Sequence, residues 1–231
     1  MVRYNKRKSI NTMDRHQVYT HLKDLGFNPT HVVDCGAAYG EWSSLIKHIF
    51  TESLILGIDA NKWTEDKIPG TDITEVVILS DIDDKEMFFY RKKEHLDNNT
   101  FCTGDSLFIE DTQHYKEHNT VKDLVKTKTL SSILKKYNIF DINLLKIDTQ
   151  GSEILIMQGL GDLLNSIEFI ELEVSLVDYN IKGCLFNDVI DFLKNRFDIY
   201  DIVELHRHNE YYLCQLDIIF QNKQSRIKKI K

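Results

Sequence analysis

The chain has 231 residues, of which 42% are hydrophobic, and its formal net charge is -7. This length and composition allow one sizeable core, and no Pro-, Gly- or Ser-rich linker divides the sequence, so we expect a single domain over residues 1–231. The acidic balance argues against a protein whose main task is to grip a polyanion, because such proteins carry a basic face. The short basic ends, about residues 1–10 and 222–231, are expected to be solvated and mobile.

The four cysteines, Cys35, Cys102, Cys184 and Cys214, lie far apart and form no CxxC pair. This spacing disfavours a disulfide framework and a zinc site. No apolar run approaches the roughly 18 residues that span a bilayer, and no apolar segment follows the basic N-terminus as in a secretory signal. We therefore expect reduced thiols, no membrane span and a cytoplasmic location.

Helical stripes and short apolar runs alternate along the chain. Apolar residues at helical spacing predict helices near residues 18–25, 42–49, 130–137, 156–164 and 186–193. Apolar runs predict buried strands at 31–36, 53–60, 74–81, 142–148 and 167–175, with closing strands at 198–205 and 215–221. Residues 86–91 are expected to form a hairpin strand, and about 95–125 a long loop with short elements. This alternation predicts an α/β fold whose mostly parallel sheet has helices on both faces.

Small residues follow the first predicted strand, and ligands of open α/β sheets bind at the carboxyl ends of strands. Small side chains let the backbone approach a ligand closely, and amides at a helix start face it. We interpret the turn as a cofactor site formed by Asp34, Gly36, Ala37, Ala38, Tyr39 and Gly40. Its GxxxG spacing differs from the GxGxxG of dinucleotide sites and resembles the first motif of class I methyltransferases. An ordinary tight turn is the alternative. If the turn lies at the surface, Gly36→Val should harm cofactor binding more than folding.

Acidic and polar residues end the next two predicted strands. Asp59 ends the second strand, where a carboxylate can accept hydrogen bonds from both ribose hydroxyls. Ser80 and Asp81 end the third, where an adenine edge would lie. A simple turn role for Ser80 is an equal alternative.

Two further carboxylates are candidates for the chemistry. Asp148 ends the fourth predicted strand, and Glu173 lies near the end of the fifth. Both are expected near the methyl group of the cofactor, where they could bind an acceptor hydroxyl or take its proton. Glu153 could instead serve the start of the following helix.

Three blocks of the chain together resemble the FkbM methyltransferase family: VVDCGAAYGEWS, NLLKIDTQGSEILIMQG and FIELEVS. The resemblance covers roughly residues 16–221, and its KID-x-QG-x-E block is the most specific part. The family's usual acid before the fourth strand is missing at Ser131. The resemblance implies a class I methyltransferase Rossmann-like fold, S-adenosylmethionine as cofactor, and O-methylation, typically of a hydroxyl on a sugar, glycan or other small acceptor. It also suggests that Ser106, Gln150 and Tyr179 contact the acceptor.

A sugar hydroxyl is a weak acid, so a base or a metal could help its methylation. His114 in the long loop is a third candidate base beside the two carboxylates. His206 and His208 are interpreted as residues of a solvated loop, and we expect no metal ligands. Two other functions stay open: a nucleic-acid methyltransferase, which the acidic charge disfavours, and a binding module of the same fold that has lost catalysis.

Overall fold

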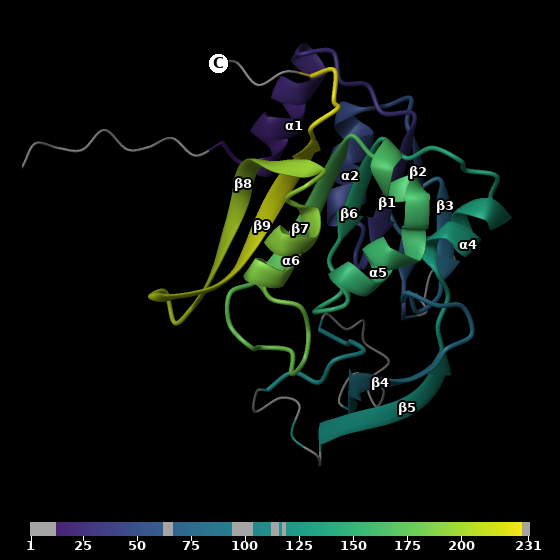
Figure 1. Ribbon diagram of the computed structural model, residues 1–231, viewed down its shortest axis with the longest axis vertical. Helices are drawn as coiled ribbons and strands as arrows, with labels where there is room; N and C mark the ends of the chain where they lie inside the picture. The colour runs from purple at the N-terminus through teal and green to yellow at the C-terminus, as the bar shows by residue number, and fades with distance from the viewer. Residues whose placement is uncertain (1–12, 62–66, 94–103, 112–115, 117–118, 228–231) are drawn as a thin grey trace, which may run out of the picture.

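The centre of the structure is a seven-stranded sheet (Figure 1). The computed structural model describes residues 13–61, 67–93, 104–111, 116 and 119–227. In spatial order the strands are β3 (Ile73–Val76), β2 (Leu54–Asp59), β1 (His31–Cys35), β6 (Leu144–Ile147), β7 (Phe169–Ser175), β9 (Tyr212–Asn222) and β8 (Phe197–His208). β9 is antiparallel to β7 and β8, and the other neighbouring pairs are parallel, as the sequence predicts.

The strand order reverses once beside β1. From β1 the chain moves outward through β2 to β3, and it then returns to place β6 on the other side of β1. In open α/β sheets, ligands bind at such a switch point, outside the carboxyl ends of the strands. The turns after β1 and β6 are therefore the expected place for a site.

Helices cover both faces of the sheet (Figure 1). Their bounds are α1 (Arg15–Asp24), α2 (Glu41–Ile49), α4 (Leu130–Lys136), α5 (Glu153–Leu160), α6 (Phe186–Leu193) and the 3-10 helix η3 (Gly161–Ser166). Buried side chains of α1 and α2 pack against one face, which includes Val32 and Phe169. Those of α4, α5 and α6 pack against the other, which includes Val33 and Ile170. Adjacent strand residues thus enter opposite cores, which explains the continuous apolar runs.

Two predicted elements differ in extent from those in the structure. The third strand ends at Val76, and residues 77–79 leave the sheet before reaching Ser80. Part of the expected loop is a strand, β5 (Thr120–Lys126), which pairs antiparallel with β4 (Glu86–Lys92) in a separate ribbon. Lys122 and Asp123 interrupt the apolar residues of β5, which are Val121, Leu124 and Val125, so the strand lacks the continuous apolar run used to predict the others.

The C-terminal part is longer and more ordered than expected. β8 reaches His208, so the interpretation of His206 and His208 as loop residues is wrong. A mobile tail was expected from about residue 222, but Ser225 donates a hydrogen bond to Glu168 and Ile227 packs against the core. Within the described residues, no helix is long and apolar enough to cross a membrane.

Candidate functional site

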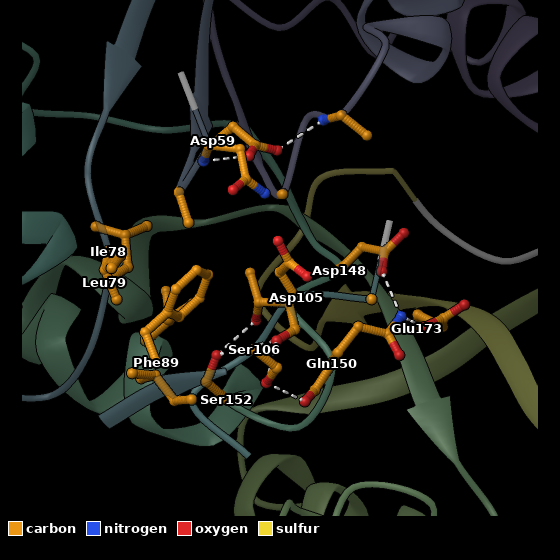
Figure 2. A pocket seen from close by; sticks show the side chains of 18 of the residues that line it. Asp59, Ile78, Leu79, Phe89, Asp105, Ser106, Asp148, Gln150, Ser152 and Glu173 are labelled. Carbon is orange, nitrogen blue, oxygen red and sulfur yellow. Dashed lines mark hydrogen bonds between the residues drawn. The ribbon is translucent and has the colours of Figure 1, made fainter. Parts of the chain in front are cut away.

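A cavity of about 410 Å³ lies at the carboxyl ends of the central strands. This volume falls in the range of small-molecule sites. Eight residues singled out in the sequence line it: Gly36, Ala38, Asp59, Ser106, Asp148, Gln150, Glu173 and Tyr179. Figure 2 shows Asp59 at one end of the cavity and Asp148, Gln150 and Glu173 together at another. The fold therefore joins the predicted cofactor and acceptor residues in one space.

The glycines of the turn after β1 have structural reasons of their own. Gly36 has a φ of +79°, and a Cβ there would lie 1.8 Å from the carbonyl oxygen of Asp148. Gly40 has a φ of +72°, and its Cβ would lie 2.2 Å from the carbonyl oxygen of Pro69. The reason expected for Gly36→Val to harm cofactor binding more than folding, a turn at the surface, is wrong for this residue, because a side chain here would meet the backbone of the turn after β6.

Asp59 is held in place by the backbone around it. Its Oδ2 accepts a hydrogen bond from the Ala38 amide at 2.9 Å, and its Oδ1 accepts one from the Asn61 amide at 2.8 Å. Each oxygen keeps capacity for a further donor, as paired hydroxyls would require. Burial raises the pKa of Asp59 to about 6.

Other members of the predicted turn lie behind the cavity lining. Asp34 is fully buried, and its Oδ2 accepts a hydrogen bond from the Ser43 hydroxyl at 2.6 Å. Its Oδ1 is buried and has no hydrogen-bond partner among the described residues. Ala37 is also buried, whereas Tyr39 is 47% exposed. These residues, with Gly40, support the turn without lining the cavity.

Ser80 and Asp81 also lie next to the cavity but outside its lining. The Ser80 hydroxyl donates to Asp81 Oδ1, which also pairs with the Lys85 ammonium. The lining is formed instead by Val77, Ile78 and Leu79. The candidate base His114 lies outside the described residues.

Asp148 is paired with a buried ammonium group. Lys146 is only 7% exposed, and its Nζ lies 2.9 Å from Asp148 Oδ2. Burial alone would raise the pKa of Asp148, but the charge of Lys146 and the hydrogen bonds from Lys146 and Gln150 together lower that pKa. Likewise, burial opposes the charge of Lys146, but Asp148, Asp34 and Glu171 together raise its pKa. Both groups therefore stay charged near neutral pH.

Glu173 lies beside Asp148 but has a different environment. It is inside β7 rather than at its end, two residues before Ser175. Its Oε2 accepts hydrogen bonds from the Gln150 amide and, at 3.1 Å, from the Gln215 amide. Burial, followed by the charges of Asp148 and Asp217, raises its pKa well above the ordinary value.

Gln150 joins the two carboxylates. Its side-chain amide donates to Asp148 Oδ1 at 3.2 Å as well as to Glu173 (Figure 2). Its φ of +57° is strained for a residue with a side chain, and the Ser106 hydroxyl donates to its carbonyl oxygen at 2.7 Å. Such strain is commonly kept where it positions functional groups.

Glu153 has a structural role. It is buried, and its Oε1 accepts hydrogen bonds from the Thr149 and Gly151 amides, both at 3.1 Å. Its Oε2 accepts one from the Cys184 thiol at 3.1 Å. Glu153 thus closes the loop that carries Asp148 and Gln150.

Several lining residues were missed in the sequence. One wall is apolar and includes Phe89, Ile78 and Leu79 (Figure 2). Val77 also lines the cavity. Glu110 accepts a hydrogen bond from Tyr179, and burial followed by this carboxylate raises the pKa of Tyr179. Gln215 reaches the cavity from β9. The sequence signal for the apolar wall was the run 74–81, which we assigned wholly to a strand.

His206 lies behind Glu173, close to Asp217 of β9. Its Nε2 is 3.2 Å from Asp217 Oδ1 and 3.8 Å from Glu173 Oε1. The other oxygen of Asp217 pairs with the guanidinium of Arg15. The bond to Asp217 is the largest cause of a raised pKa at His206.

The cavity combines an apolar wall with several carboxylates, which suits a ligand that carries a flat ring, hydroxyl groups and positive charge. Its charged lining residues are Asp59, Lys92, Asp105, Glu110, Asp148 and Glu173. A cationic ligand is favoured where carboxylates outnumber basic groups in a partly enclosed space.

The match to a family model agrees with this chemistry. The FkbM methyltransferase domain matches residues 34–200, which is most of the chain. A search of curated proteins finds no match. The fold is similar to a precorrin-6y C5,15-methyltransferase from Geobacter metallireducens GS-15, with a TM-score of 0.45 and 12% identity over 95% of this chain and 94% of that one. It is also similar to a chain of a fibrillarin/Nop5p complex, with a TM-score of 0.44 and 14% identity over 84% of this chain and 72% of that one.

Structural likenesses at these scores add nothing to the assignment, which follows from the family match. The chain belongs to the FkbM methyltransferase family, has the class I methyltransferase fold, and uses S-adenosylmethionine as its methyl donor.

Proposed function

We propose that this protein transfers the methyl group of S-adenosylmethionine to a hydroxyl of a sugar or glycan. The observation that carries the proposal is the single cavity shared by Asp59, the turn at Gly36, and the carboxylates Asp148 and Glu173. Carboxylates and amides suit an acceptor that offers hydroxyl groups.

The cofactor half of the cavity lies between the turns after β1 and β2. Asp59 would bind the two ribose hydroxyls, and residues 77–79 with Phe89 would enclose the adenine. The turn from Gly36 to Gly40 would hold the amino-acid part, whose ammonium and the sulfonium suit the nearby carboxylates. Ser80 and Asp81 would support the adenine wall from behind.

The acceptor half lies around Asp148 and Glu173. The pair would orient the hydroxyl and take its proton, while Gln150 keeps the carboxylates at a fixed separation. Ser106 and Tyr179 also line the cavity and would contact the rest of the acceptor. His114 is kept as an alternative base.

The reaction is a single displacement. The acceptor oxygen forms a bond to the methyl carbon, the bond from that carbon to sulfur breaks, and the hydroxyl proton passes to a carboxylate. The methyl donor supplies the sulfonium leaving group. The protein's contribution is alignment, which in favourable cases is worth about 7–11 kcal/mol, and base catalysis, worth about 10²–10⁴-fold.

The test is a transfer screen with methyl-labelled cofactor, read by mass spectrometry. Neutral and amino sugars, oligosaccharides and RNA are offered to the purified chain. We expect the label on a sugar hydroxyl. Label on RNA alone would replace the proposal with a nucleic-acid methyltransferase. Cofactor binding without transfer to any acceptor would favour a silent binding module.

A further inference from the structure

Three side chains from neighbouring strands converge behind the acceptor half of the cavity. They are Glu173 on β7, His206 on β8 and Asp217 on β9. One ligand atom from each lies within 4.8 Å of the other two. We infer that these residues bind a divalent transition-metal cation, of the kind represented by Mn²⁺ or Zn²⁺.

The imidazole reaches only one of the two carboxylates by a hydrogen bond. Its Nε2 carries at most one proton, and at 3.2 Å from Asp217 Oδ1 it can donate there. Glu173 Oε1 lies 3.8 Å from the same nitrogen, beyond hydrogen-bond distance, although the Glu173 side chain is only 12% exposed. A cation between the three side chains would interact with Glu173 Oε1, Asp217 Oδ1 and the imidazole at once.

The second oxygen of each carboxylate is held by other side chains. Glu173 Oε2 is held by Gln150 and Gln215, and Asp217 Oδ2 by Arg15. The free oxygens consequently point to the imidazole. Metal sites are typically oriented by such outer hydrogen bonds.

The spacing fits a coordination sphere. With metal–ligand bonds of about 2.1 Å, ligand atoms lie about 3.0–4.2 Å apart. The two separations from Nε2, 3.2 and 3.8 Å, fall within this range, and all three ligand atoms lie within 4.8 Å of one another. One imidazole with two carboxylates suits Mn²⁺ or Zn²⁺ better than an all-oxygen cation such as Mg²⁺.

The local charge also favours a cation. Arg15 is the nearby basic group on α1, but it pairs with Glu171 and Glu204 as well as Asp217. Asp148, directly after β6, adds negative charge and is paired with Lys146. The carboxylates therefore outnumber the two cations. Because Glu173 also lines the cavity, a metal here could polarise an acceptor hydroxyl.

A metal site goes beyond the proposed function, and its test requires neither cofactor nor acceptor. The full chain is freed of metal with a chelator, and Mn²⁺ is titrated in while the signal of free Mn²⁺ is followed by electron paramagnetic resonance. We expect saturation at one Mn²⁺ per chain and displacement by Zn²⁺.

Two variants locate the site. His206→Gln and Glu173→Gln should each weaken Mn²⁺ binding by about tenfold or more. The matched control is His208→Gln, an exposed histidine on the same strand and outside the cluster, which should bind as the parent does. Thermal melting verifies that each variant is folded.

Three results would overturn the inference: no saturable Mn²⁺ binding, parental binding in both His206→Gln and Glu173→Gln, or displacement by Mg²⁺ as readily as by Zn²⁺. Failure of methyl transfer in the screen would leave these binding results unaffected, so the two proposals are separately testable.

Discussion

The pKa values of the neighbouring carboxylates Asp148 and Glu173 are shifted in opposite directions because their partners differ. Lys146 holds Asp148 in its charged form, whereas Glu173 receives only neutral amide donors on Oε2 and is opposed by other carboxylates. Their positions near the carboxyl ends of adjacent strands were predictable from the sequence, since parallel strands align these ends. The partners Gln215 and Asp217 were not, because only the antiparallel return of β9 brings them there.

Asp148→Asn should keep the cofactor affinity of the parent and lose methyl transfer by about 10²–10⁴-fold, since the amide keeps the size of the side chain but cannot take a proton. Single-turnover rates with the acceptor found in the screen measure the effect. Asp141→Asn, at an exposed position near the opposite end of β1, is the control. A loss confined to acceptor KM would mark Asp148 as a binding group instead.

Asp59 predicts a pH dependence of cofactor binding. Its pKa is raised to about 6, so it is ionised above that pH and protonated below it. If the ionised form binds the ribose, affinity should be constant near neutral pH and fall by up to about tenfold per unit of pH below the pKa. Calorimetry with S-adenosylhomocysteine measures it. Asp59→Asn should bind more weakly near neutral pH and lose this dependence, and an unchanged profile in that variant would refute the assignment.

At the scale of elements, the turn after β1 packs directly against the turn after β6. The buried strands and their acidic ends were predictable, because an apolar run followed by a polar turn is a local signal. The ribbon of β4 and β5 and the length of β8 depend on pairing between distant segments, which local patterns do not encode. Residues 77–79 misled the prediction because an apolar cavity wall and a buried strand have the same composition.

The close packing of the turn after β1 makes a substitution test possible. Gly36→Ala should reduce the free energy of unfolding by at least about 2 kcal/mol, because the new Cβ would clash with the Asp148 carbonyl and the φ is positive. Gly26→Ala has a positive φ but no atom within 4 Å of the new Cβ, so it should cost only about 1 kcal/mol. Denaturant unfolding compares the two, and equal costs would show that the β1–β6 contact is not tight.

For the whole molecule, the fold places the switch point of the sheet, the cofactor turn and the acidic pair around one cavity. Helices on both faces bury the strands and leave their carboxyl ends for the site (Figure 1). The family relationship fixes the methyl donor, while the acceptor depends on side chains such as Glu110, Tyr179 and Gln215 that come from separate segments.

The most direct test of the central claim is the map of backbone amide shifts on adding S-adenosylhomocysteine, recorded by NMR on the isotopically labelled chain. We predict that the largest shifts fall on the turn from Gly36 to Gly40, on Asn61, on residues 77–79 and on Gln150. Shifts confined to the outer face of the β4–β5 ribbon or to the β8–β9 hairpin would contradict the account, as would the absence of any shift at saturating ligand.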